Sequence, residues 1–576
     1  MSRIGGLSEI VHTTMPDRIV PGDPADDPIV QTAVLTCCAP VTQISPIATP
    51  LKSRFALENL KGRLVSCPQR GSVPQKPVPA GCPAIPAGRK PHPNIKHLIV
   101  LMLENRSFDH ILGYSGIPGV DGVWDKNCSN RDRDGKEVFT SEDAEPAGDL
   151  SDPGHDFPDV RKQLYFPRQD EADWDDDAPM HGFLDSYADY VSVEKSHNLM
   201  KCFAAGSVPV ITALARNYAV CNRWFSSLPG PTMPNRLFAH AGTSKTRLDV
   251  SAEEFDISPT IYEILDCANV PSTIYSDGWT AAATFWSLMK HQDQYYGTMD
   301  EFYQDCADDN LPAYCFLEPR YASGLVDGLF RAQNDQHPDS DVTEGEHLIY
   351  RIYQAIRSNR RAWESSMLVV VWDEHGGIYD HVPPPKAIPP GDGQSCDPVF
   401  SFDRYGVRVP AVIVSAYTDH AVLNQTFDHT SLGATARKLL TGHYRDDALG
   451  QRAMAANTFD IALNRKTPRT DHVEFAPRAL SLVSPVSKTL NHLQIQHLQQ
   501  AFLLDAQLPA KLQWKPRMQQ FRDLDTRSEQ SRFAAIRSED ADAYTRRVMS
   551  TARELGPKLK IKSPGGPGCG ELKKPK

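Results

Sequence analysis

The amino-acid sequence predicts an α/β protein with a central, mostly parallel β-sheet flanked by helices. Three observations carry this prediction: short apolar runs recur along the chain, helix-like stretches lie between them, and the two kinds of segment alternate. Apolar runs without polar alternation are typical of strands that are buried on both faces of a parallel sheet.

Each predicted element follows from a local pattern. The strongest strand candidate is HLIVLML at 97–103, and the later candidates are STIYS at 272–276, MLVVVW at 367–372 and VPAVIVSA at 409–416. The segment GEHLIYRIYQAIRS at 345–358 repeats its apolar residues with helical spacing and predicts a helix before the third strand.

Changes in amino-acid composition along the chain predict three regions. Residues 1–93 are rich in Pro and small polar residues and predict an extended or disordered leader, whereas residues 94–476 hold the strand and helix signals of the main domain. In residues 477–576, HLQIQHLQQAFLL predicts one amphipathic helix, and the basic Gly- and Pro-rich end predicts a disordered tail.

Composition excludes some classes of function. The net charge of -11 over 576 residues argues against a nucleic-acid partner, which would need an excess of basic residues. No run reaches the roughly 18 apolar residues that span a bilayer, so any membrane contact is expected to be peripheral. The N-terminus lacks a recognisable export signal, which favours the cytoplasm, and the twelve cysteines, without a CxxC pair, are expected to be mostly reduced.

Polar side chains follow the two most apolar strand candidates. Glu104 and Asn105 come directly after 97–103, and Asp373 and Glu374 come directly after 367–372. Because functional groups in an open α/β sheet gather beyond the carboxyl ends of the strands, these four side chains are expected at one edge, where they could hold a divalent cation. The alternative for each pair alone is a helix cap or turn former.

Thr232 lies in SSLPGPTMPNR at 226–236, whose prolines and glycine predict a rigid loop with Thr232 exposed. A threonine hydroxyl activated by a base or metal can act as a nucleophile, although a single turn threonine needs no such role. His155 in DPGH and His337 in NDQHPDSD lie in turn-rich segments, where each could bind phosphate oxygens or protonate a leaving group, or be a surface histidine.

Several segments together resemble the phosphoesterase family, which contains bacterial phospholipases C, plant non-specific phospholipases C and a bacterial acid phosphatase. They run in the family's order over residues 94–440, about 60% of the chain: ENRSFDH at 104–110, GPTMPNR at 230–236, HPDSDVTEGE at 337–346, DEHGGIYDHVPPP at 373–385 and RYGVRVPAVIVSAYT at 404–418.

The resemblance implies an alkaline-phosphatase-like core with one active-site metal ion. Glu104, Asn105, Asp373 and Glu374 would surround the metal, and Thr232 would be the nucleophile. His155, His337 and Asn105 would stabilise the phosphoryl group. The other motif residues have supporting roles: His110 and His381 would anchor hydrogen bonds behind the site, Arg236 would brace Thr232 or bind phosphate, and Asp428 and His429 would cap a helix.

The resemblance further implies hydrolysis of phosphate esters through a phosphothreonine. Its threonine favours phospholipase C cleavage of glycerophospholipids to diacylglycerol and a phosphorylated headgroup. Two alternatives are an acid phosphatase acting on phosphomonoesters and a catalytically silent lipid- or phosphate-binding protein. The expected cofactor is one divalent metal ion, either Ca²⁺, Mg²⁺, Mn²⁺ or Zn²⁺, and the sequence does not determine the oligomeric state.

Overall fold

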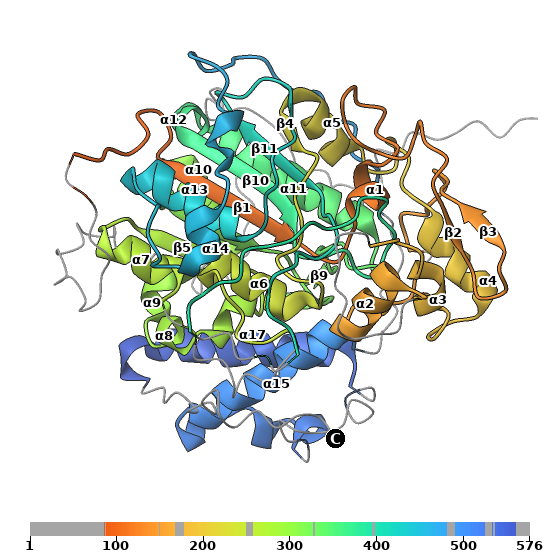
Figure 1. Cartoon of the computed structure of the whole chain (residues 1–576). Helices are drawn as coiled ribbons and strands as arrows, with labels where there is room; N and C mark the ends of the chain where they lie inside the picture. Colours follow the sequence, from red (N-terminus) through yellow and green to blue (C-terminus); the bar gives the residue numbers. More distant parts are fainter. Residues whose placement is uncertain are drawn as a thin grey trace, which may run out of the picture. The chain divides into compact units, whose positions relative to one another are not determined.

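The computed structural model in Figure 1 describes residue 86 and residues 88–559, except for 149, 168–177, 249–256, 258, 327–328, 394–396, 398, 481–489, 523, 525–532 and 534–535. Most of the predicted leader and all but the first two residues of the predicted basic tail lie outside the described residues, so the structure does not test these two predictions.

One eight-stranded sheet forms the centre of the fold. Its strands, in spatial order, are β12 (Ala421–Leu423), β4 (Ala219–Cys221), β11 (Ala411–Ser415), β10 (Ser366–Trp372), β1 (His97–Leu103), β7 (Tyr314–Glu318), β5 (Ser272–Ser276) and β6 (Tyr296–Gly297). The pairings are parallel except those of β11, which runs antiparallel to both of its neighbours.

The central strands are buried because their side chains are apolar on both faces. Every residue of β10 is buried, and in β1 only His97 at the start is partly exposed. β1 and β10 pair in register from His97 with Ser366 to Leu103 with Trp372. Consequently the residues that follow these two strands leave the sheet side by side.

Two groups of helices cover the sheet in Figure 1. One group contains α5 (Pro209–Asn217), α10 (Met299–Asp308), α11 (Val342–Ser358) and α12 (Arg360–Ser365). The other contains α6 (Thr232–Ala241), α7 (Ile261–Cys267), α13 (Thr430–Thr441) and α14 (Gly450–Ala455).

Smaller elements extend this core. They are α1 (Phe108–Leu112), α2 (Phe157–Tyr165), α3 (Phe183–Tyr187), α4 (Val193–Ser196), α8 (Trp286–Met289), α9 (Gln292–Tyr295) and the hairpins β2 (Ser129–Arg131) with β3 (Glu137–Phe139) and β8 (Gly324–Val326) with β9 (Leu329–Arg331). Near the C-terminus, α15 (His492–Gln507) packs against α17 (Ser538–Leu555).

The structure confirms the predicted α/β class and all four predicted strands. The predicted helix at 345–358 begins three residues earlier, at Val342, because the Asp341 side chain caps it by accepting from Thr343 N–H at 2.9 Å. The helix predicted from HLQIQHLQQAFLL is α15, but the prediction that it is amphipathic was wrong, because nearly all of its described side chains are buried.

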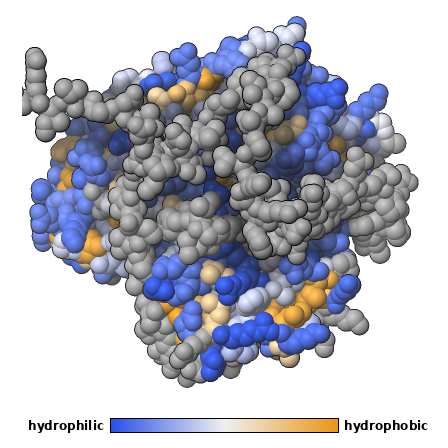
Figure 2. Space-filling model, turned by 180° about the vertical axis from the view of Figure 1, so that it is seen from behind, coloured by the Kyte–Doolittle hydropathy of each residue, from blue (hydrophilic) through white to orange (hydrophobic). Residues whose placement is uncertain are grey.

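Two further observations concern the surface and the cysteines. Among the described residues, no helix has both the length and the apolarity to cross a bilayer. In the coloured part of Figure 2, hydrophobic residues form small patches among hydrophilic ones. Five described cysteines are free, in agreement with the expectation of mostly reduced thiols, whereas Cys267 is disulfide-bonded.

Candidate active site

The two polar pairs meet at the carboxyl ends of β1 and β10. Glu104, Asn105, Asp373 and Glu374 are all at most 1% exposed. The two segments are joined directly, since Asn105 N–H donates to Asp373 Oδ1 at 3.0 Å. A fourth carboxylate, Glu318, ends β7 on the other side of β1. The prediction missed Glu318, although the segment YCFLE carries the same signal of an acidic residue after apolar ones.

Thr232 is the buried first residue of α6 rather than an exposed part of a loop, so the loop prediction was wrong for this residue in both respects. Pro234 is tolerated in the first helical turn, where a backbone N–H has no partner within the helix. Thr232 Oγ1 lies 3.1 Å from Asn105 Oδ1 and 3.3 Å from Glu104 Oε2. The hydroxyl therefore faces the residues that follow β1, at the positive end of the helix dipole.

Asn235 fixes the chain in front of Thr232. Its Oδ1 accepts from Leu228 N–H at 3.1 Å, and its Nδ2 donates to the carbonyls of Gly230 at 2.9 Å and Pro231 at 3.0 Å. These contacts hold the non-helical segment in one conformation against the first turn of α6, because they satisfy backbone groups that the helix leaves unpaired.

Arg236 lies one helical turn after Thr232 and joins the ends of three strands. Its guanidinium forms ion pairs with Glu104, with Asp373 at 3.1 Å and with Glu318 at 2.7 Å. It also donates to the carbonyls of Met102 and Leu103, both at 3.3 Å. Because these partners occupy the guanidinium, the geometry favours the bracing role over the phosphate-binding one.

His155 and His337 are both buried, and Asp152 lies between them. Asp152 Oδ1 is 3.8 Å from His155 Nδ1 and 3.3 Å from His337 Nε2. His337 Nδ1 is also 2.7 Å from Asp339 Oδ1, and His155 Nε2 is 3.4 Å from Asn105 Nδ2. The structure thus brings His155 to the edge of the sheet, and it adds Asp152 and Asp339, which the sequence reasoning did not single out.

Electrostatics favour the charged form of both histidines. Burial opposes protonation, but the carboxylates of Glu374 and Asp152 outweigh it and raise the pKa of His155 to about 9. For His337, the carboxylates of Asp339 and Asp152 likewise outweigh burial and raise the pKa well above its ordinary value. Burial acts in the opposite sense on Glu104, whose pKa is raised well above its ordinary value although Arg236 opposes the shift.

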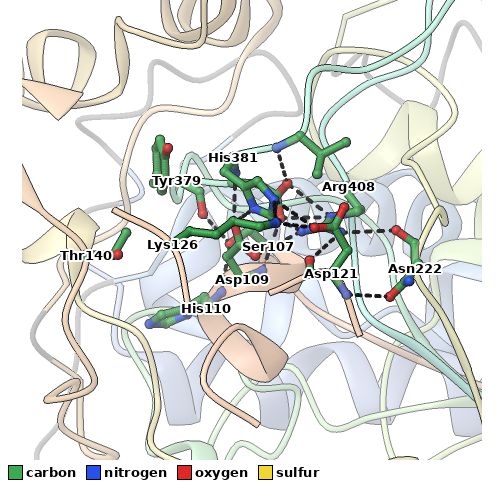
Figure 3. A network of polar contacts seen from close by, with 12 residues as sticks. Ser107, Asp109, His110, Asp121, Lys126, Thr140, Asn222, Tyr379, His381 and Arg408 are labelled. Carbon is green, nitrogen blue, oxygen red and sulfur yellow. Dashed lines mark hydrogen bonds and ion pairs between the residues drawn. The ribbon is translucent and has the colours of Figure 1, made fainter. Parts of the chain in front are cut away.

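His381 belongs to a separate polar network, drawn in Figure 3. Its Nδ1 lies 2.6 Å from Asp109 Oδ2. The Arg408 guanidinium forms ion pairs with the same Asp109, at 2.9 Å, and with Asp380, at 3.1 Å. The network therefore connects the segment after β1 to the segment after β10. His110 lies beside this network: its Nδ1 is 3.3 Å from Arg106 Nη1, and burial lowers its pKa well below the ordinary value.

Two groups of side chains are candidates for holding a metal ion. Among the described residues, Asp109, Asp380 and His381 have ligand atoms within 4.8 Å of one another. However, Arg408 and backbone N–H groups already satisfy these two carboxylates.

The predicted group is less satisfied. Glu374 Oε1 is buried and has no hydrogen-bond partner among the described residues. The chemistry of the donor set, which consists of carboxylate, amide and hydroxyl oxygens, suits a hard divalent cation. The residues present therefore fit a bound cation at this edge of the sheet.

The capping role expected for Asp428 and His429 was wrong. His429 stands at the start of α13 without a capping hydrogen bond from its side chain. Instead its Nε2 lies 2.5 Å from the Asp373 carbonyl oxygen, and its Nδ1 accepts from Trp224 Nε1–H at 3.3 Å. The Asp428 carboxylate accepts from the hydroxyls of Ser227 at 2.8 Å and Thr430 at 2.5 Å. His429 thus supports the backbone of a predicted metal ligand, a contact that no local pattern could indicate.

Comparison with known proteins places this geometry in a family. The model of the Phosphoesterase family matches residues 95–440. Non-specific phospholipase C3 of Arabidopsis thaliana is 33% identical over 402 residues, which cover 66% of this chain and 75% of that protein. Non-specific phospholipase C1 of the same plant is 34% identical over 425 residues, covering 69% and 77%. Hemolytic phospholipase C of Pseudomonas aeruginosa is 24% identical over 393 residues, covering 59% and 52%.

A solved structure of a protein in the alkaline phosphatase superfamily from Vibrio parahaemolyticus matches 45% of this chain and 67% of that chain, with 10% identity and a TM-score of 0.29. That score is too low to carry an argument about this site. The family model, by contrast, spans more than half of the chain, and the two plant proteins exceed 30% identity over three quarters of their length. This chain belongs to the phosphoesterase family.

Proposed function

We propose that this chain is a metal-dependent phospholipase C that hydrolyses glycerophospholipids to diacylglycerol and a phosphorylated headgroup. The observation that carries the proposal is the position of Thr232 Oγ1, 3.1 Å from Asn105 Oδ1 and 3.3 Å from Glu104 Oε2 at the carboxyl end of β1. The names of the plant and bacterial relatives support the choice of a phospholipid as substrate.

The cation would be held by Glu104, Asn105, Asp373 and Glu374, and when bound it would supply a positive charge for the nucleophile and for one phosphoryl oxygen. The unpartnered Glu374 Oε1 supports this assignment. Arg236 would fix the positions of the Glu104 and Asp373 carboxylates around such a cation, because it forms an ion pair with each of them.

In the proposed first step, Thr232 Oγ1 attacks phosphorus and its proton passes to Glu104 Oε2 along the existing hydrogen bond. As the bond from phosphorus to the diacylglycerol oxygen breaks, His155 Nε2–H protonates the leaving oxygen. Asn105 Nδ2 and His337 stabilise charge on the remaining phosphoryl oxygens.

In the second step, water attacks the phosphothreonine. The neutral His155 takes one proton from the water as the bond from phosphorus to Thr232 Oγ1 breaks, and Glu104 returns its proton to Oγ1. The phosphorylated headgroup leaves, and each group regains its initial protonation state. The same two residues therefore act in opposite directions in the two halves of the reaction.

The test is a product assay on purified protein. Phosphatidylcholine vesicles and p-nitrophenyl phosphate are supplied in parallel, after EDTA treatment and after addition of Ca²⁺, Mg²⁺, Mn²⁺ or Zn²⁺. Cation-restored release of diacylglycerol supports the proposal. Restored cleavage of the monoester alone would assign an acid phosphatase, and vesicle binding without product under every cation would assign a silent lipid-binding protein.

Two threonine variants test the nucleophile. Thr232→Ala should abolish turnover without a loss of fold, and Thr232→Ser should retain part of it, because serine keeps the hydroxyl but not the stiff side-chain torsion. Thr284→Ala is the matched control, since Thr284 is also buried but its hydroxyl donates to the Ala281 carbonyl. Normal turnover by Thr232→Ala would refute the assignment.

A further inference from the structure

The helix α15 lies outside the segment that matches the family, yet it contacts the predicted active site. The match ends at residue 440, and α15 begins at His492. In Figure 1, α15 and α17 lie together in blue along one side of the core. Near its start, α15 approaches Tyr321: Gln494 Nε2 donates to the Tyr321 carbonyl at 2.7 Å, and the ring of His497 meets the Tyr321 ring edge-on at 4.8 Å.

Tyr321 connects this helix to the groups around Thr232. Its ring lies 5.2 Å from the Arg236 guanidinium, and its hydroxyl donates to Glu318, which is also an ion-pair partner of Arg236. On the same side, Leu493 packs in one apolar cluster with Tyr321 and Met233, the residue after Thr232. Any movement of Tyr321 would therefore shift Arg236 and the start of α6.

His497 is an unusual residue for a purely structural position. It is 3% exposed, and its Nε2 has no hydrogen-bond partner among the described residues. Burial and the positive charge of Arg236 lower its pKa well below the ordinary value, so the ring is neutral and acts on Tyr321 through its shape. Beside it is a cavity of about 20 Å³ lined in part by Trp279, Tyr321 and His497, which leaves room for a slightly larger ring.

We propose that His497 and Gln494 are positioning residues for the phosphoesterase reaction, which they support by holding Tyr321 against Arg236. The inference rests on the proposed function, because it assigns these residues a part in the geometry of that site. If these residues hold Tyr321 in place, α15 is a necessary part of the active site, although it lies outside residues 95–440, which the family model matches.

Two variants test the contacts separately. His497→Ala removes the ring that supports Tyr321. Gln494→Glu removes the donor to the Tyr321 carbonyl but keeps the oxygen that accepts from Asn491 N–H at 3.2 Å and caps the helix. On the soluble diester p-nitrophenyl phosphorylcholine, each should lower kcat by about tenfold or more and change KM by less than about twofold, as expected when catalytic groups are displaced slightly. His497→Phe should restore kcat, since it returns a ring to the site.

Phe502→Ala is the matched control. Phe502 lies on α15 but its ring meets the Tyr544 ring of α17 edge-on at 5.2 Å, so its loss should lower the melting temperature of the protein without lowering kcat at 25 °C. Normal kcat in both His497→Ala and Gln494→Glu, or an equal loss in Phe502→Ala, would overturn the inference while wild-type turnover upheld the proposed function. A wild-type protein that cleaves no phosphodiester would overturn both.

Discussion

Replacement of Arg236 by methionine should destabilise the fold in a way that depends on pH. Three buried carboxylates, those of Glu104, Glu318 and Asp373, share this one guanidinium. Methionine keeps much of the aliphatic volume but no charge. Because loss of one partner of a buried ion pair typically costs about 3 to 5 kcal/mol, Arg236→Met should lower the free energy of unfolding by about that amount at pH 7.

The dependence on pH follows from the protonation of these carboxylates. An ordinary glutamate has a pKa of 4.5, so protonating one such group costs about 3.5 kcal/mol at pH 7 but only about 0.7 kcal/mol at pH 5. In the variant, the folded-state pKa values of Glu104 and Asp373 rise further above the unfolded ones, because the opposing charge of Arg236 is gone. Its stability is therefore lost as the pH rises, and the destabilisation should shrink by a few kcal/mol between pH 7 and pH 5.

The assay is urea unfolding followed by far-ultraviolet circular dichroism, in EDTA so that no cation replaces the lost charge. Arg360→Met is the control, since the Arg360 side chain is 85% exposed and pairs with Glu364 at the surface; it should leave the urea midpoint unchanged. If Arg236→Met lowered the midpoint no more than Arg360→Met, or equally at both pH values, the carboxylates would not be charged partners of Arg236 in the folded protein.

Three further predictions concern the supports of the site. Gly376→Ala should lower the free energy of unfolding in urea by about 1 to 3 kcal/mol, because Gly376 has φ +63° and an added Cβ would lie 2.3 Å from the Asn105 carbonyl oxygen. Gly135→Ala is the control and should lower it less, because Gly135 has φ +84° but no atom near the added Cβ. Burial raises the pKa of Glu346 to about 8 from 4.5, so its stabilising contribution is complete below pH 4.5 and is lost as the pH rises through about 8; urea midpoints of Glu346→Gln should fall less than those of the wild type over that range. Glu374→Gln should weaken the binding of Mn²⁺, measured by calorimetry, by about tenfold or more; unchanged affinity would exclude Glu374 as a ligand.

The strands could be predicted because their signal is local. In β1 and β10, nearly every residue is apolar and buried, so the continuous apolar segment in the sequence is enough to predict a buried strand. The direction of β11 could not be predicted in the same way, because antiparallel pairing with β10 and β4 depends on how distant segments connect. The three-residue strand β4 is too short to leave a pattern.

The start of α6 was predictable but was not predicted. The prolines around Thr232 suggested a loop, although a proline is acceptable in the first turn of a helix. The helix ends at Gly242, which has φ +73° and donates its N–H to the Phe238 carbonyl, a common way for helices to terminate. Reading the segment from this glycine backwards would have indicated a helix and placed Thr232 at its positive end.

The contacts around the site resisted prediction because they join remote segments. Glu318, Tyr321 and His429 each lie more than 80 residues from Thr232, and no spacing in the sequence links them. Their positions depend on the order of β10, β1 and β7 in the sheet and on the packing of α15. Sequence patterns can predict which side chains leave the ends of strands, whereas the fold decides which of them meet.

The two carboxylate clusters beside the sheet differ in how their charge is balanced, and this difference locates the chemistry. Asp109 and Asp380 share Arg408 and several backbone donors, so the protein itself neutralises them and uses them to tie two segments together. Glu104, Glu318 and Asp373 share the single charge of Arg236, while Glu374 Oε1 has no hydrogen-bond partner among the described residues. Arg236 and the charged His155 beside Glu374 leave these four carboxylates with an excess of negative charge. Because buried negative charge without a full counter-charge is costly, the second cluster is the one that gains most from an added cation, and it is the one that faces Thr232.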